Sequence, residues 1–592
     1  MRTRKRKILT WIAIILIAAI LVLGGTAWYL DARLEPILKE QLQSKVRESS
    51  NGLYRLELKG LTIKLFLGRI YLTEPHLIAD TARYKQLKSA NLAPQSVFDV
   101  YCQSIALTDI NFWNFYKSKK LTTGLLLVKE PRLLWIKDLT IPGIKKKEPP
   151  KTLFELLKPV FNSIALTEIK FVDGEVVYKR IFGKRNTILN VGRLTVLLDD
   201  VLIDSLAEID STRFFYSKNI RVRIEDHEYL SPNKRYKIVV GQLNLATNDS
   251  SVTMQNVTLK PQYKKQDFAK MVGEQTDRFS ISVDSISIEG LHLKSFLFDE
   301  RIMANKISIV RPFIEAFRDK NLPNKNLKEK LLFHEMLQQV KHEVLIKKIQ
   351  VTDGRVEYEE LPLGRAKSGT IYFTNLNATL TNVSNLLNPA KPMISIKSSA
   401  FLMGSGELIV DFNFPVNPKE KTFIVKGKIK PMELKRMNPA LQSLAFVRIK
   451  TGKLNSMDFT IKANSSTSKT RMEFLYDDLE IQLLNKETGT TENQGFVSTL
   501  VNAIIISKSN PIPEVPIRIA NTTYHRDKTR SVFNFLWKSL FTALKPSVGI
   551  TDNKEEKIKS LKEKQVSHKL RKKKKKEDKS RKEQIEKQVQ KD

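Results

Sequence analysis

The chain has 592 residues but a single cysteine, Cys102. One thiol cannot form an intramolecular disulfide, and it cannot supply a multi-thiolate metal site. Long apolar runs are also scarce. Only residues 8–30 form a long uncharged apolar stretch, and 28% of all residues are charged. This composition excludes a membrane protein with many spans and favours a folded body with one membrane segment at most.

The signature motifs of common enzyme classes are missing. The sequence has no HExxH zinc motif, no GxSxG nucleophile elbow, no phosphate-binding P-loop and no GxGxxG dinucleotide motif. Its seven histidines are scattered. His334 and His342, which we expect on one helix, are eight residues apart. We therefore predict that the protein is not an enzyme and has no cofactor and no metal site.

Charge is strongly one-sided, with 100 basic and 63 acidic residues and a net charge of +37. Apart from short basic runs near the two ends, the excess is spread thinly along the chain. A thin spread argues against the concentrated footprint of a nucleic-acid-binding protein and favours attraction to anionic surfaces such as lipid headgroups. We predict no nucleic-acid partner.

Residues 8–30 predict a transmembrane anchor. At about 1.5 Å per residue they span roughly 34 Å, enough to cross the hydrocarbon core of a bilayer. Trp11, Trp28 and Tyr29 stand where interfacial aromatic residues belong. The basic residues 1–7 predict a cytoplasmic N-terminus and an exported body. A cleaved signal peptide is the alternative, but the apolar stretch is longer than a usual signal-peptide core.

The predicted body covers residues 53–550. Residues 31–52 repeat leucine or valine every fourth position, which predicts an amphipathic helix at the entry to the body. From residue 53 the period changes to two, as in half-buried strands, so we predict a mainly β body. Apolar residues that alternate in this way are candidates for the lining of an apolar groove: Leu408, Val410, Phe412, Phe414, Phe423 and Val425.

An internal duplication relates residues 104–178 to residues 285–358 at an offset of 180 to 181 positions. Pro131 in the first copy matches Pro312 in the second, and each proline predicts a sheet edge or a turn. The pairs Asp173-Gly174 and Asp353-Gly354 also match, and we interpret them as hairpin turns with positive φ. Repeats of this kind bury their apolar faces by stacking, which predicts an elongated repeated antiparallel β-groove with short helices.

A wide apolar stripe lies near the C-terminal end of the body and is followed by Pro546. Its residues are Phe533, Leu536, Trp537, Leu540, Phe541 and Leu544. Their spacing predicts one helix face. The helix either plugs the end of the sheet or makes a second membrane contact. Residues 551–592 form a Lys-rich tail without apolar periodicity, for which we expect a solvated state.

These features together resemble the AsmA-like family of envelope proteins. The segments that carry the resemblance are KGLTIKLFLGRIYLTEPHLIAD (59–80), two IxxxDGxVxY units (169–178 and 349–358), GELIVDFNFPV (406–416) and RIKTGKLNSMDFTIKA (448–463). The chain is shorter than the longest members of that family, and its Lys-rich tail is not part of the family pattern.

The resemblance implies a location and a function. It implies a bacterial inner-membrane protein with one span and a periplasmic body, in which an apolar β-groove binds phospholipid acyl chains. Lipid transfer or outer-membrane homeostasis would follow, with phospholipid and the inner membrane as partners, and the outer membrane or an anionic envelope polymer as a partner of the tail. The alternative is an envelope scaffold or assembly factor that does not transport lipid.

Overall fold

The protein is described from a computed structural model. The structure describes residues 35–141, 152–158, 161–183, 185–207, 209–325, 327–387, 390, 393–417, 419–484 and 506–550. These residues are mainly β and contain 25 strands. The chain divides into two compact units. Unit 1 comprises Met1–Lys260 and Asp284–Lys294, and unit 2 comprises Pro261–Val283 and Ser295–Asp592. A mainly β body is therefore confirmed.

Among its described residues, unit 1 contains twelve complete strands, all but the last residue of a thirteenth, and three short labelled helices. The strands are β1 (Tyr54–Glu57), β2 (Gly60–Lys64), β3 (Arg69–Thr73), β4 (His76–Ala79), β5 (Ser96–Tyr101), β6 (Ser104–Thr108), β7 (Lys120–Lys129), β8 (Arg132–Asp138), β9 (Ser163–Phe182), β10 (Arg185–Ile203), β11 (Ser217–Leu230), β12 (Tyr236–Ala246) and β13 (Ser251–Pro261). The helices are α2 (Thr81–Ser89), α3 (Phe112–Ser118) and α4 (Leu153–Leu157), and a 3-10 turn, η1 (Leu65–Leu67), joins β2 to β3.

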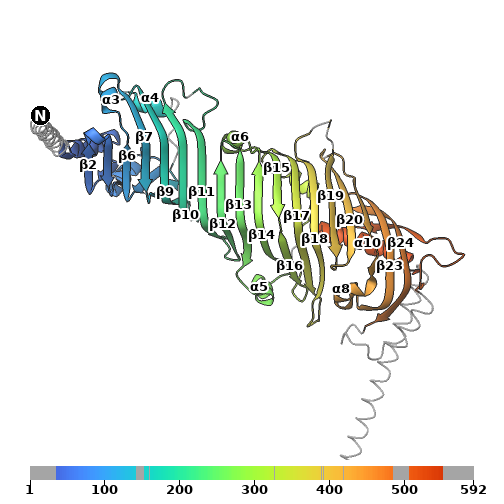
Figure 1. Cartoon of the computed structure of the whole chain (residues 1–592). Coiled ribbons are helices and arrows are strands. Elements are labelled where there is room, and N and C mark those ends of the chain that lie inside the picture. The colour runs from blue at the N-terminus through green and yellow to red at the C-terminus, as the bar shows by residue number, and fades with distance from the viewer. Residues whose placement is uncertain are drawn as a thin grey trace, which may run out of the picture. The chain divides into compact units, whose positions relative to one another are not determined.

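Two runs of paired strands meet on the long strand β9. One run is β2, β3, β6 and β7, and the other is β1, β4, β5 and β8. β7 pairs with the first half of β9 and β8 with its second half. Beyond β9 the order continues through β10, β11 and β12. Figure 1 shows these strands side by side in unit 1.

Unit 2 continues the strand pattern and adds more helix. Its strands are β15 (Ile302–Val310), β16 (Phe313–Asp319), β17 (Val344–Leu361), β18 (Gly369–Ser384), β19 (Met393–Leu402), β20 (Gly406–Pro415), β21 (Phe423–Ile429), β22 (Met432–Glu433), β23 (Val447–Ala463), β24 (Thr467–Leu483) and β25 (Ile519–His525). Its helices are α5 (Lys265–Val272), α7 (Phe333–Gln338), η2 (Leu434–Met437), α8 (Asn438–Leu444) and α10 (Val532–Ser547). β14 (Asp277–Glu289) and α6 (Leu293–Phe298) contribute residues to both units.

The matched prolines Pro131 and Pro312, and Pro75 in the same kind of position, interrupt the runs of paired strands. The interruptions are Glu74-Pro75, Glu130-Pro131 and Arg311-Pro312, and the residue before proline has a φ of 47°, 45° and 46° respectively. At Pro131 and Pro312 the residue before proline donates its N–H to β9 or β17, and the proline carbonyl accepts an N–H from the same strand. At Pro75 the partners are Gln103 and Cys102, between β5 and β6. Proline lacks an N–H, so it fits a paired strand only where the ladder is already broken. The prediction of an edge or turn at Pro131 and Pro312 is therefore wrong.

The Asp-Gly pairs also lie inside strands. Asp173 and Gly174 are in the middle of β9, and Asp353 and Gly354 are in the middle of β17. The two aspartates have φ values of 55° and 54°, so the predicted positive φ is present. It belongs to a β-bulge, where the register shifts against the neighbouring strand, and not to a hairpin turn. The hairpin interpretation is corrected accordingly.

The duplication appears as a repeated strand arrangement. In unit 1, β7 and β8 both pair with β9, and in unit 2, β15 and β16 both pair with β17. All four of these pairings are parallel, whereas the pairings from β17 to β21 are antiparallel. The sheet is therefore mixed, and the prediction of an antiparallel sheet is wrong in this respect. A chain that returns to pair in parallel needs a crossover, and α4 and α7 lie in these connections.

Helices fill the apolar face of β19 to β25 in unit 2. One buried cluster joins these strands to residues from α10 and to Leu332, which precedes α7. All six candidate groove residues belong to this cluster or pack against it, and Phe414, Phe423 and Val425 are at most 2% exposed. They share one face, as the alternation predicts. Val410, Phe414, Phe423 and Val425 are buried in this core, so the prediction that these four residues line an open groove is corrected. Leu408 and Phe412 are half-buried beside the core, and their place in a groove stays a prediction.

The predicted entry helix is present over residues 35–49. It contacts the first strands: Glu35 Oε1 accepts the N–H of Ile63 at 3.1 Å, and Gln43 donates to the carbonyl of Leu56 at 3.0 Å. Among the described residues, no helix combines the length and the apolar character needed to cross a bilayer. The predicted anchor, residues 8–30, and the predicted tail, residues 551–592, both lie outside the described residues.

Candidate functional site

One face of unit 1 carries an unbroken row of aliphatic and aromatic side chains, which we call the apolar stripe. Residues that pair directly across neighbouring strands point to the same face, so the register identifies the members of the stripe. They come from β2, β3, β6, β7, β9, β10, β11 and β12: Leu61, Ile63, Ile70, Leu72, Ile105, Leu107, Leu126, Val128, Ile169, Phe171, Val196, Leu198, Ile220, Val222 and Leu245.

The bulges keep this apolar face intact along each strand. β9 gains an extra residue at Asp173, and β10 gains one opposite, at Arg193. The extra residue in β9 returns Val176 to the same face as Phe171, and the extra residue in β10 likewise keeps Val191 on the same face as Val196. Without the bulges the second half of β9 would turn its valine away from the stripe. We call the bulges at Asp173 and Arg193, which lie next to each other on β9 and β10, the bulged line. It joins two apolar areas into one face.

Beyond the bulged line the same face becomes aromatic. Phe98, Trp135 and Tyr178 are register partners on β5, β8 and β9. The Phe98 and Trp135 ring centroids are 5.7 Å apart, and those of Trp135 and Tyr178 are 4.8 Å apart. The indole Nε1 of Trp135 is buried and has no hydrogen-bond partner among the described residues. A large part of this face is therefore apolar on both sides of the bulged line.

The opposite face of the same strands is mixed. The row next to the stripe contains Thr62, Tyr71, Ala106, Leu127, Lys170, Leu197, Arg221 and Ala246. Arg221 forms an ion pair with Asp199 at 3.0 Å on this side. An ion pair of this kind on an exposed surface contributes little stability but keeps the face hydrated. The two faces of unit 1 therefore differ in polarity.

Most of the apolar stripe is only half-buried. Leu61, Ile63, Val128 and Ile220 are buried, and the remaining members are intermediate in exposure. The corresponding face of β21 and β24 in unit 2 is closed, since Phe423 and Met472 are 0% exposed. Apolar area that stays exposed loses about 25 cal/mol per Å² of hydrophobic stabilisation. The stripe is thus an extended apolar surface that is less completely covered than the core of unit 2. Cover is present at Leu126, Ile169 and Leu198, which pack against a small buried cluster that Phe154 and Leu157 of α4 also contact.

Side chains on β14, β16 and β17 change from apolar to charged along the length of these strands. One row across them and β18 is apolar: Ile281, Ile314, Val356 and Phe373. Four residues further along the same face the row contains Asp277, Arg318 and Glu360. Arg318 pairs with Asp277 at 2.5 Å, and the hydroxyl of Tyr358 donates to Glu360 at 2.8 Å.

Burial and hydrogen bonding set the protonation of this charged row. Burial opposes the charge of Arg318, but its hydrogen bonds to Asp277 more than compensate and raise the pKa of the guanidinium. Burial also raises the pKa of the Tyr358 hydroxyl, and the neighbouring Glu360 carboxylate adds to the effect. Tyr358 therefore stays neutral and donates its proton, and the row keeps its charges paired at the edge of the apolar face.

The six residues that the sequence predicts on one apolar helix face, Phe533 to Leu544, lie on α10 and differ in how far they are buried. The inner side of α10, which includes Phe535, Ser539 and Ala543, packs against the core, and the helix lies against β24 and β25 (Figure 1). Leu536, Leu540 and Leu544 pack partly against the same core, as a plugging helix predicts. Phe533 and Trp537 are 68% and 41% exposed, and the Trp537 ring stacks on Phe541. A membrane contact by this outer side stays a prediction.

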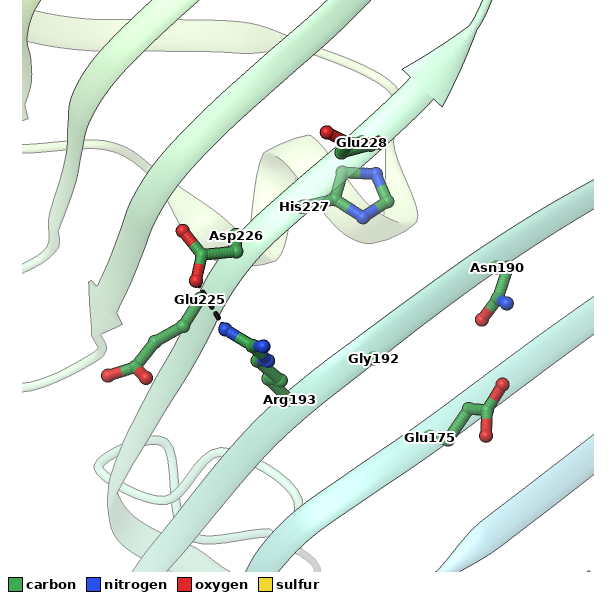
Figure 2. Close-up of a pocket in the computed structure, with 8 residues that line it drawn as sticks. All are labelled: Glu175, Asn190, Gly192, Arg193, Glu225, Asp226, His227 and Glu228. Atoms are coloured by element: carbon green, nitrogen blue, oxygen red, sulfur yellow. Dashed lines mark hydrogen bonds and ion pairs between the residues drawn. The ribbon is translucent and has the colours of Figure 1, made fainter.

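The bulged line of unit 1 borders a hollow of about 440 Å³. Figure 2 shows its lining, in which Arg193 forms an ion pair with Asp226 and the remaining side chains include Glu175, Glu225 and His227. The hollow is open, and its charged lining differs from an apolar ligand pocket. Among the described residues, no cluster of histidine, cysteine and acidic side chains has the geometry of a metal site. We assign no ligand to this hollow.

Comparison with known proteins adds no assignment: no protein-family model matches the chain, and no curated protein matches it significantly. The resemblance to the AsmA-like family therefore stays a prediction. So does the assignment of Trp11, Trp28 and Tyr29 to a membrane anchor, since these three residues lie outside the described part of the chain.

Sequence reasoning missed the main surface of unit 1. It selected alternating residues in β20 and β21, where the pattern is cleanest, and passed over the stripe. The stripe strands are harder to recognise because bulges shift the alternation by one residue, as between Phe171 and Val176. A signal was available: the matched Asp-Gly pairs mark the bulges, and reading each half-strand separately recovers the period of two.

Proposed function

We propose that the protein is an envelope lipid-binding protein of the AsmA-like type, which holds phospholipid acyl chains against the apolar face of its sheet. The observation that carries the proposal is the apolar stripe, continuous in register over eight strands of unit 1 and still half-exposed. The absence of enzymatic motifs from the sequence is compatible with a binding function.

Physical chemistry supports acyl chains as the occupant. Each methylene group that leaves water for an apolar surface gains about 0.8 kcal/mol, so an acyl chain of ordinary length gains several kcal/mol even with partial contact. Such contact is not directional, which suits a surface of Ile, Leu, Val and Phe without ordered hydrogen-bonding groups. A surface of this size on a soluble protein without an occupant is uncommon.

The grading of unit 2 supports an amphipathic ligand in particular. The face passes from Ile314 and Val356 to the charged row of Arg318 and Glu360 within four residues along the strand. At about 3.3 Å per residue this is roughly 13 Å, shorter than an extended acyl chain. A lipid lying along the strands would keep its chains on the apolar row and its headgroup beside the charged row. We infer lipid transfer between envelope membranes as the use of this surface.

The experiment compares neighbouring positions on opposite faces. A photo-reactive benzophenone amino acid is placed at position 171, on the apolar stripe, and in a matched variant at position 170, on the other face of β9. The full chain is irradiated in cells and its crosslinked products are analysed by mass spectrometry. We expect phospholipid adducts at position 171 and roughly tenfold fewer at position 170, because only one face contacts acyl chains.

A charge placed on the stripe supplies a second measurement. Val196→Glu should abolish most lipid recovery with the purified full chain, whereas Leu197→Glu, one residue away on the other face, should not. Equal lipid adducts at positions 170 and 171, or none at either, would reject lipid binding on this face. The scaffold alternative would then be favoured if the chain still supported envelope integrity.

A further inference from the structure

Four large apolar side chains are unusually exposed on two connecting segments of unit 1. Phe66 and Leu67 on η1 are 70% and 59% exposed, and Trp113 and Tyr116 on α3 are 66% and 82% exposed. We call these four residues the interfacial patch. Exposed apolar residues are common singly, but four large ones on two adjoining segments indicate a binding surface.

The fold holds the two segments together and orients the rings outward. The carbonyl of Gly68, directly after η1, accepts the N–H of Ile110 at 2.9 Å, which ties η1 to the start of α3. A side chain at Gly68 would collide with the Ile110 backbone, so the two segments approach as closely as glycine permits. On α3, Phe115 packs on Phe161 at 5.6 Å, and this contact turns the other side of the helix toward solvent.

That outer side of α3 has the form of an interfacial helix. Trp113 and Tyr116 are one turn apart, and their rings stack at 6.4 Å. The Nζ atom of Lys117 lies 4.7 Å from the centre of the Trp113 ring. Trp and Tyr with a neighbouring Lys are typical of the region where lipid headgroups meet acyl chains, because each ring has an apolar body and a polar tip.

Charge around the patch is almost entirely basic. The two segments, residues 64–69 and 109–120, contain the cations Lys64, Arg69, Lys117, Lys119 and Lys120, and Asp109 is their only acidic residue. All five cations are exposed, and none forms an ion pair with another part of the chain that the structure describes. Each basic residue near an anionic bilayer contributes about 1 kcal/mol of attraction.

The patch lies where the N-terminal segment joins the body. Glu35, the first described residue, accepts a hydrogen bond from Ile63, three residues before Phe66. The preceding 34 residues contain the apolar stretch 8–30, and only four residues separate that stretch from Glu35. The η1 part of the patch is therefore held near Glu35, the first described residue.

We propose that the interfacial patch inserts into the headgroup region of an anionic phospholipid bilayer and seats unit 1 on that bilayer. This rests on the proposed function only in placing the protein at a membrane, and it does not require lipid on the apolar stripe. The two contacts have different purposes. The apolar stripe holds acyl chains away from water, whereas the patch fixes one end of the body against the surface from which lipid enters.

The test uses the full chain with a fluorescent probe. Tyr116→Cys is labelled with an environment-sensitive nitrobenzoxadiazole dye, and Asn248→Cys, at an exposed position between β12 and β13, is the matched control. The native Cys102 is 5% exposed, and burial raises the pKa of its thiol, so it should label poorly. Both proteins are reconstituted into vesicles of phosphatidylglycerol and phosphatidylcholine that carry a lipid with a shallow nitroxide quencher.

We expect the quencher to reduce emission at position 116 by roughly twofold or more and to leave position 248 nearly unchanged. Replacing Lys117, Lys119 and Lys120 with glutamine should weaken the quenching, as should vesicles of phosphatidylcholine alone. Equal quenching at both positions, or none at position 116, would overturn the proposal. So would a blue shift at position 116 that depends on protein concentration and not on lipid, since it indicates a second copy of the chain.

This result is independent of lipid on the stripe. Crosslinking from position 171 is measured in the same vesicles, and either contact can fail alone. Quenching at position 116 without adducts at position 171 would retain the patch and reject acyl binding. Adducts at position 171 without quenching at position 116 would retain acyl binding and reject the patch.

Discussion

The apolar stripe of unit 1 and the closed core of unit 2 arise from the same strand pattern and end in different states. In both, apolar residues pair directly across successive strands on one face. In unit 2, α10 and the segment around α7 cover that face, and Phe423 and Met472 are 0% exposed. In unit 1, Phe171 and Val196 remain half-buried.

This difference shows that alternation along a strand predicts which face of the sheet is apolar. It does not predict what covers that face. A helix from the same chain, a lipid or a partner can each satisfy an apolar face, since the hydrophobic effect is not directional. Residues outside the strands determine whether a helix of the same chain covers the face. On α10 these residues are Ser539, Ala543 and Ser547, which are small enough to approach the strands closely. The hydroxyls of Ser468 and Ser539 meet at 2.6 Å across this contact.

The largest expected effect compares one phenylalanine from each state. Phe423→Ala should reduce the free energy of unfolding of unit 2 by about 3–5 kcal/mol, because it leaves a cavity in a closed core. Phe171→Ala should cost unit 1 only about 1–2 kcal/mol, because its ring is half-exposed. Urea unfolding, followed by hydrogen exchange of each unit, measures both. Equal costs would mean that the stripe is covered as completely as the core.

Much of this architecture could be predicted from sequence. The mainly β class, the entry helix, the duplication and the helix at α10 all follow from periodicity and self-comparison. The parallel pairings could not, because sequence pattern does not distinguish which strand a returning chain joins. The sequence predicts turns at Asp173 and Asp353, where the structure has bulges, because Asp-Gly favours positive φ in either setting.

The open and closed faces could not be separated for a related reason. Val410 and Phe171 have the same alternating context, and only the fold reveals that helices cover one of them. The interfacial patch was missed because Phe66 and Trp113 are 47 residues apart, and each alone is an ordinary exposed or core aromatic residue.

A second comparison uses two glycines. Gly427 on β21 faces Phe459, whose ring occupies the space that a Cβ atom would take, whereas Gly192 on β10 has open space at that position. Gly427→Ala should cost about 1–3 kcal/mol, because Phe459 must shift within a closed core. Gly192→Ala should be nearly neutral. Thermal unfolding of the two variants checks this, and a neutral Gly427→Ala would indicate that the core of unit 2 is loosely packed.

The smallest expected effect depends on pH and distinguishes the same two states. His334 is 5% exposed, stacks on Phe414 at 5.6 Å, and has a buried Nδ1 without a partner among the described residues. Burial lowers the pKa of His334 below its usual 6.5, although the nearby Glu335 opposes this.

Near pH 6.5, His334 therefore binds a proton in the unfolded chain but stays neutral in the folded chain. The stability of unit 2 should fall as pH decreases below about 6.5, by at most about 1.4 kcal/mol per pH unit, until the folded pKa is reached. Hydrogen exchange at pH 7.5 and 5.5, corrected for the intrinsic rate, should show looser amides around α7 and β20 with the apolar stripe unchanged. His334→Leu should remove this contribution. If the stability of the variant kept the full pH dependence, protonation of His334 in the closed core would not be its cause.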